Sequence, residues 1–484
     1  MRSSFEEKTG GMTIGFTRNK SHIYFGYDIN QIDDALFPGA GMDSPISRGQ
    51  VFRTGFEKKY DSGLVRNIDA SAYASLVDHV MDNYSLRSAT SFSKTDSTSN
   101  TFGGKVKTDL ALLGKIFKTS LEYRSNNRDA NMFSGTSRSS VNRLQTVMWP
   151  DITSKEIGLA TETTHNFSKI NRLVVGGRYD RVDVDYGRAD QKASVTGKSA
   201  NDVYRMFYGY GADKKSENNF GGLLRYEHDL ESNITLYSGL SRSVRTADAT
   251  ERGLANYMVM MGNNQSWVGN PRINPEKHHQ LDIGLSKNTK EWNFDVSAYV
   301  NRVSDFILRD SARAQDGILL NAPNADVYRN VDALLSGFEV KGGWNLSQKI
   351  RFNGNATYTY GKNLDDKMPL AQIPPLQGKL GLVWKAHEYV NFESDMRFAF
   401  KQSRVDTNPT IGTGRDYGKT SGYAVLDLGA TITKLKPASF KIGVSNLFDQ
   451  KYANHLSRSN ISDPTQVRVN EPGRSFYIKA KFPF

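Results

Sequence analysis

Apolar and polar residues alternate along most of the chain. In the C-terminal stretch SFYIKAKFPF, one face carries two lysines and the other face is apolar. The apolar face holds Phe476, Ile478, Ala480, Phe482 and Phe484. A period of two is typical of a strand with one apolar and one wet face. We count about 19 such segments, most of them near the ten residues that a tilted barrel strand needs to cross a bilayer. Other examples are HIYFGYDIN, FKTSLEYRS, EIGLATETTH, HQLDIGLSK, WNFDVSAYVNRV and GKLGLVWKA.

The connections between these segments are of two kinds. Short turns such as FSKIN, LESN and KNTKE alternate with long polar stretches. The long stretches are Asp34–Gly49, Asn131–Ser154, Gly187–Asn218, Ala247–His278 and Asp310–Asp326. Short periplasmic turns and long external loops are typical of a barrel in the outer membrane of a Gram-negative bacterium. The sequence therefore predicts an all-β fold, a transmembrane antiparallel β-barrel; a large secreted all-β protein is the alternative.

Composition narrows the function. The 484 residues include no Cys, carry a net charge of +12 and have a mean hydropathy of −0.55. No apolar run approaches the roughly 20 residues of a membrane-spanning helix. The basic residues are spread along the chain without a block or nucleic-acid motif, so we expect no nucleic-acid partner. No G-x-S-x-G, H-E-x-x-H or phosphate-loop motif occurs, so we expect neither an enzyme nor a catalytic cofactor.

The stretch from Arg66 to Tyr84 contains the most distinctive chemistry. Its even positions are apolar from Ile68 to Leu76, whereas its odd positions are mostly polar and should face the barrel lumen. His79 and Met81 fall on the odd face, and their backbones lie about 6.6 Å apart along a strand. An imidazole and a thioether at that spacing can converge on one ion, and this donor pair suits copper best. Simple packing of a Met beside a His is the alternative.

Other methionines are weaker candidates. Met258, Met260 and Met261 cluster in the external stretch YMVMMG. They could capture copper before its transfer to the interior, or they could form an apolar contact that closes the loops. Met132 and Met148 fall in a predicted external loop and carry no motif.

Three motifs in the second half of the chain resemble the barrel of TonB-dependent outer-membrane receptors. They are NPRINPEKHHQLDIGL, GVSNLFDQKY and PGRSFYIKAKFPF. The matching positions are Asn270, Pro271, Pro275 and Glu276 in the first, Asn446, Leu447, Phe448 and Tyr452 in the second, and Pro472, Gly473, Arg474 and Phe484 in the third. The resemblance implies a barrel of 22 strands around a plug, with a terminal Phe that the barrel-assembly machinery reads.

The N-terminal third resembles the copper receptors of this family, the OprC/NosA type. GMDSPISRGQVFRTGFEKKY followed by VDHVMDNYSLRS carries this likeness. In those receptors an H-x-M pair on a barrel strand, here His79 and Met81, holds copper together with a Cys-x-x-x-Met segment of the plug. The present sequence has no Cys, so the resemblance implies that half of the family's site is missing.

The resemblance also bears on the extent of the chain. The first segment aligns with about the fourth strand of a 22-stranded barrel. We therefore expect residues 1–484 to be the barrel domain of a longer receptor, without its signal, TonB box, plug and first strands. About 19 strands are an odd number, so we expect either an open edge or parallel pairing of the two ends.

The implied function is copper uptake across the outer membrane, with the copper ion as the transported ligand. The implied partners are the TonB–ExbB–ExbD complex, reached through the missing N-terminal part, together with lipopolysaccharide and outer-membrane lipid. Two alternatives remain: a receptor for a siderophore or another metal chelate, and a plugless passive pore.

Overall fold

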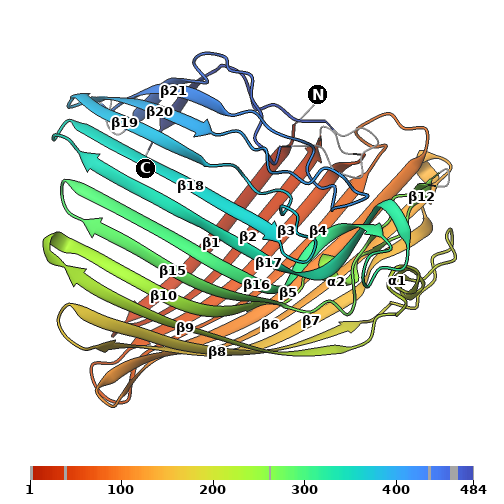
Figure 1. Ribbon diagram of the computed structural model, residues 1–484, viewed down its shortest axis with the longest axis horizontal. Helices are drawn as coiled ribbons and strands as arrows, with labels where there is room; N and C mark the ends of the chain where they lie inside the picture. Colours follow the sequence, from red (N-terminus) through yellow and green to blue (C-terminus); the bar gives the residue numbers. More distant parts are fainter. Residues whose placement is uncertain (1–3, 38–40, 261–262, 434–437, 458–466, 483–484) are drawn as a thin grey trace.

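The computed structural model describes residues 4–37, 41–260, 263–433, 438–457 and 467–482. Nineteen long strands form the wall: β1 (Glu6–Arg18), β2 (Ser21–Ala35), β3 (Asp43–Lys59), β4 (Val65–Asp82), β5 (Phe92–Leu112), β6 (Lys115–Gly135), β7 (Arg143–Asn166), β8 (Asn171–Tyr186), β9 (Lys215–Leu230), β10 (Ile234–Arg245), β15 (Glu276–Asn288), β16 (Trp292–Arg313), β17 (Asn321–Asn345), β18 (Ile350–Asn363), β19 (Gln377–His387), β20 (Val390–Ala399), β21 (Tyr423–Ile432), β22 (Ser439–Ser445) and β23 (Ser475–Lys481). Each pairs antiparallel with the next, and β10 pairs with β15. The expected antiparallel barrel wall is confirmed (Figure 1).

The outer face of the wall is apolar and ends in an aromatic girdle near the short turns. The rings of Trp292 and Trp344 stack at 4.7 Å, and Phe352 lies 5.9 Å from Trp344. Trp384 and Phe392 form a further pair at 5.6 Å. Aromatic rings at such positions mark the membrane–water interface of a barrel. In the described ranges, no helix is both long and apolar enough to cross a membrane.

The opposite end of the wall carries a packed cap. Its elements are α1 (Ala200–Tyr208), α2 (Ala249–Gly253), β11 (Ala255–Asn256), β12 (Val259–Met260), β13 (Asn263–Asn264) and β14 (Trp267–Val268), and the short 3₁₀ helix η1 (Arg138–Ser140) lies on the same side. The 3₁₀ helix η2 (Glu231–Asn233) lies in the turn between β9 and β10. Figure 1 shows α1 and α2 at the end away from the short turns. Tyr204 and Phe207 of α1 are fully buried against Val268 and Val327. In the described residues, the long stretches thus contain two short helices, several two-residue strands and the upper ends of the wall strands.

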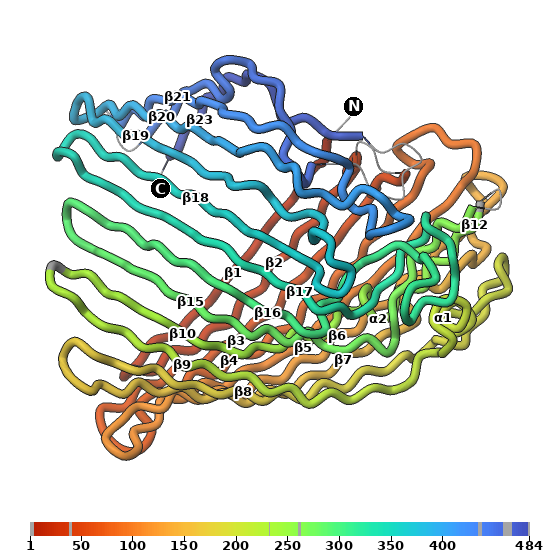
Figure 2. The backbone as a smooth tube through the Cα atoms, in the orientation of Figure 1, coloured from red at the N-terminus to blue at the C-terminus, as the bar shows by residue number. Residues whose placement is uncertain are grey.

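The two ends of the wall leave open edges. Within the described residues, β1 pairs only with β2 and β23 only with β22. All thirteen residues of β1 are exposed. The trace winds from the red strands behind to the blue strands in front (Figure 2). Because nineteen alternating strands put β1 and β23 in the same direction, antiparallel closure needs an odd number of additional strands.

Candidate functional site

β4 directs His79 and Met81 into the lumen. Ala74 of this strand is paired with Phe52 of β3 and Phe102 of β5, whose rings are 46% and 52% exposed on the outer surface. Even-numbered residues of β4 therefore face outward. Because side chains alternate along a strand, His79 and Met81 point to the opposite, lumen side, as the alternation predicted.

The pair lies above the apolar band. The outward-facing row that contains Leu76 already includes Gln50 and Asn100. The next outward row pairs Asp78 with Arg48, so the outer surface is charged there. A charged side chain that faces the hydrocarbon core destabilises the barrel. His79 therefore lies beyond the membrane-spanning part of β4, toward the external mouth.

His79 is positioned by two serine neighbours. Its register partners are Ser47 on β3 and Ser97 on β5, and the Ser97 hydroxyl donates to the His79 carbonyl at 3.2 Å. Burial lowers the pKa of the His79 imidazole. A lowered pKa keeps the ring neutral at physiological pH, which is the form that binds a metal ion.

Two further thioethers lie close to Met81. The register partner of Met81 is Thr95, and the partner of Thr95 on β6 is Met132, which is 6% exposed. The Met148 sulfur of β7 lies 3.9 Å from the Thr95 hydroxyl. Three methionines from three different strands thus surround one threonine on the lumen face. The prediction that Met132 and Met148 lie in an external loop is wrong, because β6 runs to Gly135 and β7 starts at Arg143.

The loop methionines have a different environment. Met258 precedes β12, and its backbone N–H donates to the Ser266 hydroxyl at 2.9 Å. Met260 belongs to β12, and its backbone pairs with Asn263. Met261 lies outside the described residues. Nowhere in the part of the chain that the structure describes do three or more His, Cys, Asp or Glu residues gather as a metal site.

The first barrel motif is an anchor for the cap. The Asn270 side-chain oxygen accepts from the Tyr210 hydroxyl at 2.9 Å, and its amide donates to the Tyr328 carbonyl at 3.2 Å. Pro271 and Pro275 lead from this asparagine into β15, with Pro271 buried. These contacts indicate that the motif fixes the conformation of the loop that leads into β15.

Glu276 belongs to the same anchor. It lies above the membrane-spanning part of β15, because the outer face of this strand is already polar at His279, two positions above Leu281. The carboxylate accepts from Arg245 Nε and the Ile307 amide, both at 2.8 Å. Burial opposes ionisation of Glu276, but hydrogen bonds from Arg245, His278 and the Ile307 amide together lower its pKa to about 2.

The second and third motifs meet each other. Asn446 is 2% exposed, and its amide donates to the carbonyls of Gln450 at 2.9 Å and Pro472 at 3.3 Å. Asp449 accepts from the Arg474 amide at 2.8 Å, beside Gly473.

The remaining residues of these motifs complete the entry to β23. The Leu447 amide donates to the Leu426 carbonyl at 2.8 Å, and Phe448 is exposed on the surface. The Tyr452 hydroxyl accepts from Arg397 at 3.2 Å. Phe484 lies outside the described residues. The two motifs therefore fix the start of the last strand.

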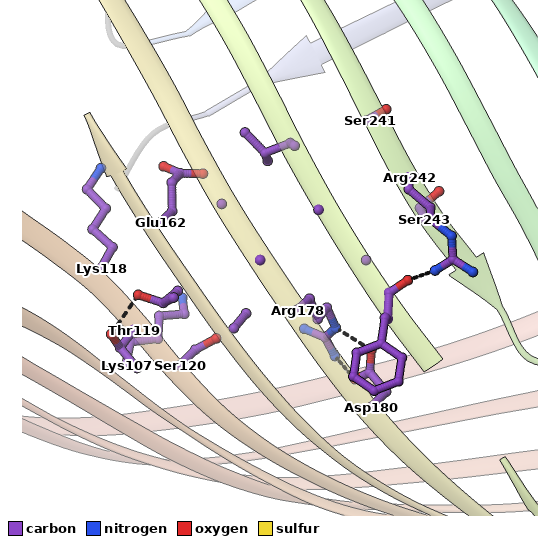
Figure 3. Close-up of a pocket in the computed structure, with 18 of the residues that line it drawn as sticks. Lys107, Lys118, Thr119, Ser120, Glu162, Arg178, Asp180, Ser241, Arg242 and Ser243 are labelled. Carbon is purple, nitrogen blue, oxygen red and sulfur yellow. Dashed lines mark hydrogen bonds and ion pairs between the residues drawn. The ribbon is translucent and has the colours of Figure 1, made fainter. Parts of the chain in front are cut away.

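A hollow lies lower in the lumen, nearer the short turns (Figure 3). It has a volume of about 560 Å³, and its lining includes Lys105, Lys118, Glu162, Arg178 and Asp180. Arg178 Nη2 lies 2.7 Å from Asp180. No imidazole or thioether is among the described residues that line this hollow, so the hollow suits a polar ligand better than a soft metal ion.

Most of the chain matches a known family. A family model described as "TonB dependent receptor-like, beta-barrel" covers residues 3–447. The chain belongs to the TonB-dependent receptor family. It is therefore an outer-membrane barrel of a family of receptors and transporters.

Curated relatives of this receptor are distant. The ferrienterobactin receptor of Escherichia coli (strain K12) is 24% identical over 294 residues, which cover 55% of this chain and 38% of the relative. Hemoglobin-haptoglobin utilization protein B of Neisseria meningitidis serogroup C is 25% identical over 254 residues, 44% of this chain and 31% of the relative. The matches thus span less than half the length of these relatives.

Solved structures share the receptor's fold. The copper transporter OprC superposes with a TM-score of 0.82 at 24% identity, covering 100% of this chain and 72% of that one. The ferric yersiniabactin uptake receptor FyuA from Yersinia pestis gives 0.72 at 11% identity, covering 98% and 70%.

Proposed function

We propose that this receptor barrel takes up copper ions across the outer membrane and that His79 and Met81 are its ligands. The observation that carries the proposal is their shared lumen face above the membrane, where burial also lowers the pKa of the imidazole. Met132 and Met148 extend the donor set with two further thioethers near Thr95. Sulfur and imidazole donors favour copper, Cu(I) above all, over zinc, calcium or magnesium. The likeness in fold to a copper transporter is consistent with this substrate.

Transport in the complete receptor depends on partners. The outer membrane has no ATP, so the energy comes from the inner membrane through TonB and the ExbB–ExbD proteins. In our proposal, residues 1–484 are the barrel part of a longer receptor, and a plug segment with Cys-x-x-x-Met supplies the remaining ligands. The open edges of β1 and β23 support this, since an odd number of further strands would close the wall. Assembly into the membrane uses the barrel-assembly machinery, and lipopolysaccharide surrounds the outer face.

A second candidate function is uptake of a siderophore or another metal chelate. The names of the ferrienterobactin and ferric yersiniabactin receptors favour it. A chelate would be held by aromatic and arginine side chains of the cap, so replacing Met81 would leave its uptake intact. A passive pore is the third candidate. It would conduct in planar bilayers without TonB.

Metal titration of the purified chain separates these candidates. We expect weak copper binding by the chain alone, reduced about tenfold or more by His79→Ala or Met81→Ala, since loss of a ligand costs at least as much as loss of a residue that supports one. His279→Ala is the matched control, because His279 is exposed on the outer face of β15. Sub-micromolar affinity that survives His79→Ala would overturn the assignment.

A further inference from the structure

Arg128 differs from the other arginine on the lumen face of its strand. On β6, Arg124 and Arg128 have the same parity and both face the lumen. Arg124 is ion-paired with Glu156 at 2.8 Å. Arg128 has no carboxylate within 4.0 Å among the described residues, and its Nε is buried without a hydrogen-bond acceptor.

Trp149 is a second donor without an acceptor at the same place. The guanidinium carbon of Arg128 lies 5.5 Å from the centre of the Trp149 ring. The indole Nε1 is also buried, and no described residue accepts from it. A buried N–H without an acceptor costs free energy, more so when the group is charged. Two such donors side by side form a place prepared for an anionic acceptor.

This place adjoins the His79–Met81 pair. His79 shares a hydrogen-bonded row with Ser97, Ala130 and Trp149 across four strands. Arg128 lies two strands from β4, roughly 10 Å between backbones, and one lumen-facing position lower. An ion held by His79 and Met81 would therefore share this end of the lumen face with Arg128 and Trp149.

We propose that Arg128 and Trp149 form an anion subsite that binds the carboxylate of a small ligand on the incoming metal ion. The metal arrives as a complex with a carboxylate-bearing molecule of amino-acid size. His79 and Met81 replace its water ligands, while the outer carboxylate oxygen accepts from Arg128 and Trp149. A planar guanidinium matches a carboxylate better than an ammonium group does. This inference rests on the proposed function of the pair.

The charge of the site supports an anionic companion. The donors of His79, Met81, Met132 and Met148 are neutral, so a bound copper ion keeps its full positive charge beside the Arg128 cation. A carboxylate on the metal lowers the charge of the complex and removes this repulsion.

The test compares two copper complexes of equal size. The complex of Cu²⁺ with one equivalent of glycine carries a carboxylate. The complex of Cu²⁺ with one equivalent of ethylenediamine has a chelate ring of the same size but no carboxylate. We measure the ratio of their dissociation constants on the detergent-solubilised chain by calorimetry. The expected result is a preference for the glycine complex of about tenfold or more, the size of one charge-assisted hydrogen bond. A ratio near one in the unmodified chain would overturn the subsite.

Variants assign the preference to residues. Arg128→Met brings the ratio close to one, Trp149→Phe lowers it in part, and Arg124→Met, the ion-paired control on the same face, leaves it as in the unmodified chain. Arg128→Lys, which retains the charge but not the planar fork, gives a reduced ratio and keeps the test usable if Arg128→Met does not fold. A full preference in Arg128→Met would refute the proposal.

The His79→Ala variant distinguishes failure of the anion subsite from failure of the metal site. If it weakens both complexes and the ratio in the unmodified chain is one, only the subsite is wrong. If neither complex depends on His79, the metal site itself is wrong.

Discussion

The upper and lower parts of the lumen differ in chemistry although β4 to β7 contribute to both. Near the external mouth, β4 to β7 present neutral donors, with His79, Met81 and Met132 on one face. Lower on the wall, Arg178 is held by Asp180 and Glu122. An ion pair in contact with water contributes little free energy and selects no particular ion. Thioethers, in contrast, discriminate between metals. In our proposal, metal selectivity therefore belongs to the external end of the wall.

The largest expected effect comes from removing both ligands at the upper end. The double variant His79→Ala/Met81→Ala should lose copper binding by about a hundredfold or more, because each ligand contributes at least about tenfold. Titration with Cu(I) or Ag(I) measures this. Met12→Ala, an exposed methionine on the outer face of β1, is the control. Equal losses in the two proteins would show that the lost copper binding is not specific to the upper lumen.

The outlying thioethers should contribute less. Met148→Leu keeps the side-chain volume near Thr95 and removes the sulfur. We expect copper affinity to fall about threefold to tenfold, less than for a direct ligand. Met396→Leu, on the outward-facing row with Leu380, should leave it unchanged. A Met148→Leu variant with unchanged affinity would limit the site to His79 and Met81.

Proton competition provides a smaller and graded effect. Burial lowers the pKa of His79 from its ordinary value of about 6.5. Copper affinity should therefore decline in acid as the imidazole protonates, with a midpoint below that ordinary value. A titration series across pH 4 to 8, roughly the range around that value, measures the midpoint. A midpoint above the ordinary value would contradict the buried position.

The smallest effect on metal binding is expected from the lower lumen. Arg178→Met removes the partner of Asp180 and Glu122. It should leave copper affinity unchanged and lower barrel stability by about 1 kcal/mol, because the charges are partly exposed. Heat-modifiable migration on gels reports the stability. A loss of copper affinity in this variant would extend the selective region down the wall.

Sequence reasoning found the wall and the inward pair because alternation is clear where one face meets lipid. From Ile68 to Leu76 the outward positions are apolar, so the direction of His79 follows by parity. Above the membrane both faces of a strand are wet, and alternation disappears. That is why Met132 and Met148 could not be distinguished from loop residues.

The cap was missed for a related reason. The segment that contains α1 lies within a long polar stretch, and its nine residues are too few for a clear helical period. A local signal was present: Ser199 and Asp202 form a capping box, and Gly209 ends the helix with φ of 82°. The burial of Tyr204 depends on partners such as Gly253, whose carbonyl accepts from its hydroxyl at 2.6 Å. Contacts between such distant segments cannot be inferred from local pattern.

The most direct test of the central claim is X-ray absorption at the copper edge of the Cu(I)-loaded chain. We predict a coordination shell with both sulfur and imidazole nitrogen, from which His79→Ala removes the nitrogen contribution and Met81→Ala reduces the sulfur contribution. A shell of oxygen and nitrogen only, unchanged in both variants, would contradict the assignment of the His79–Met81 pair.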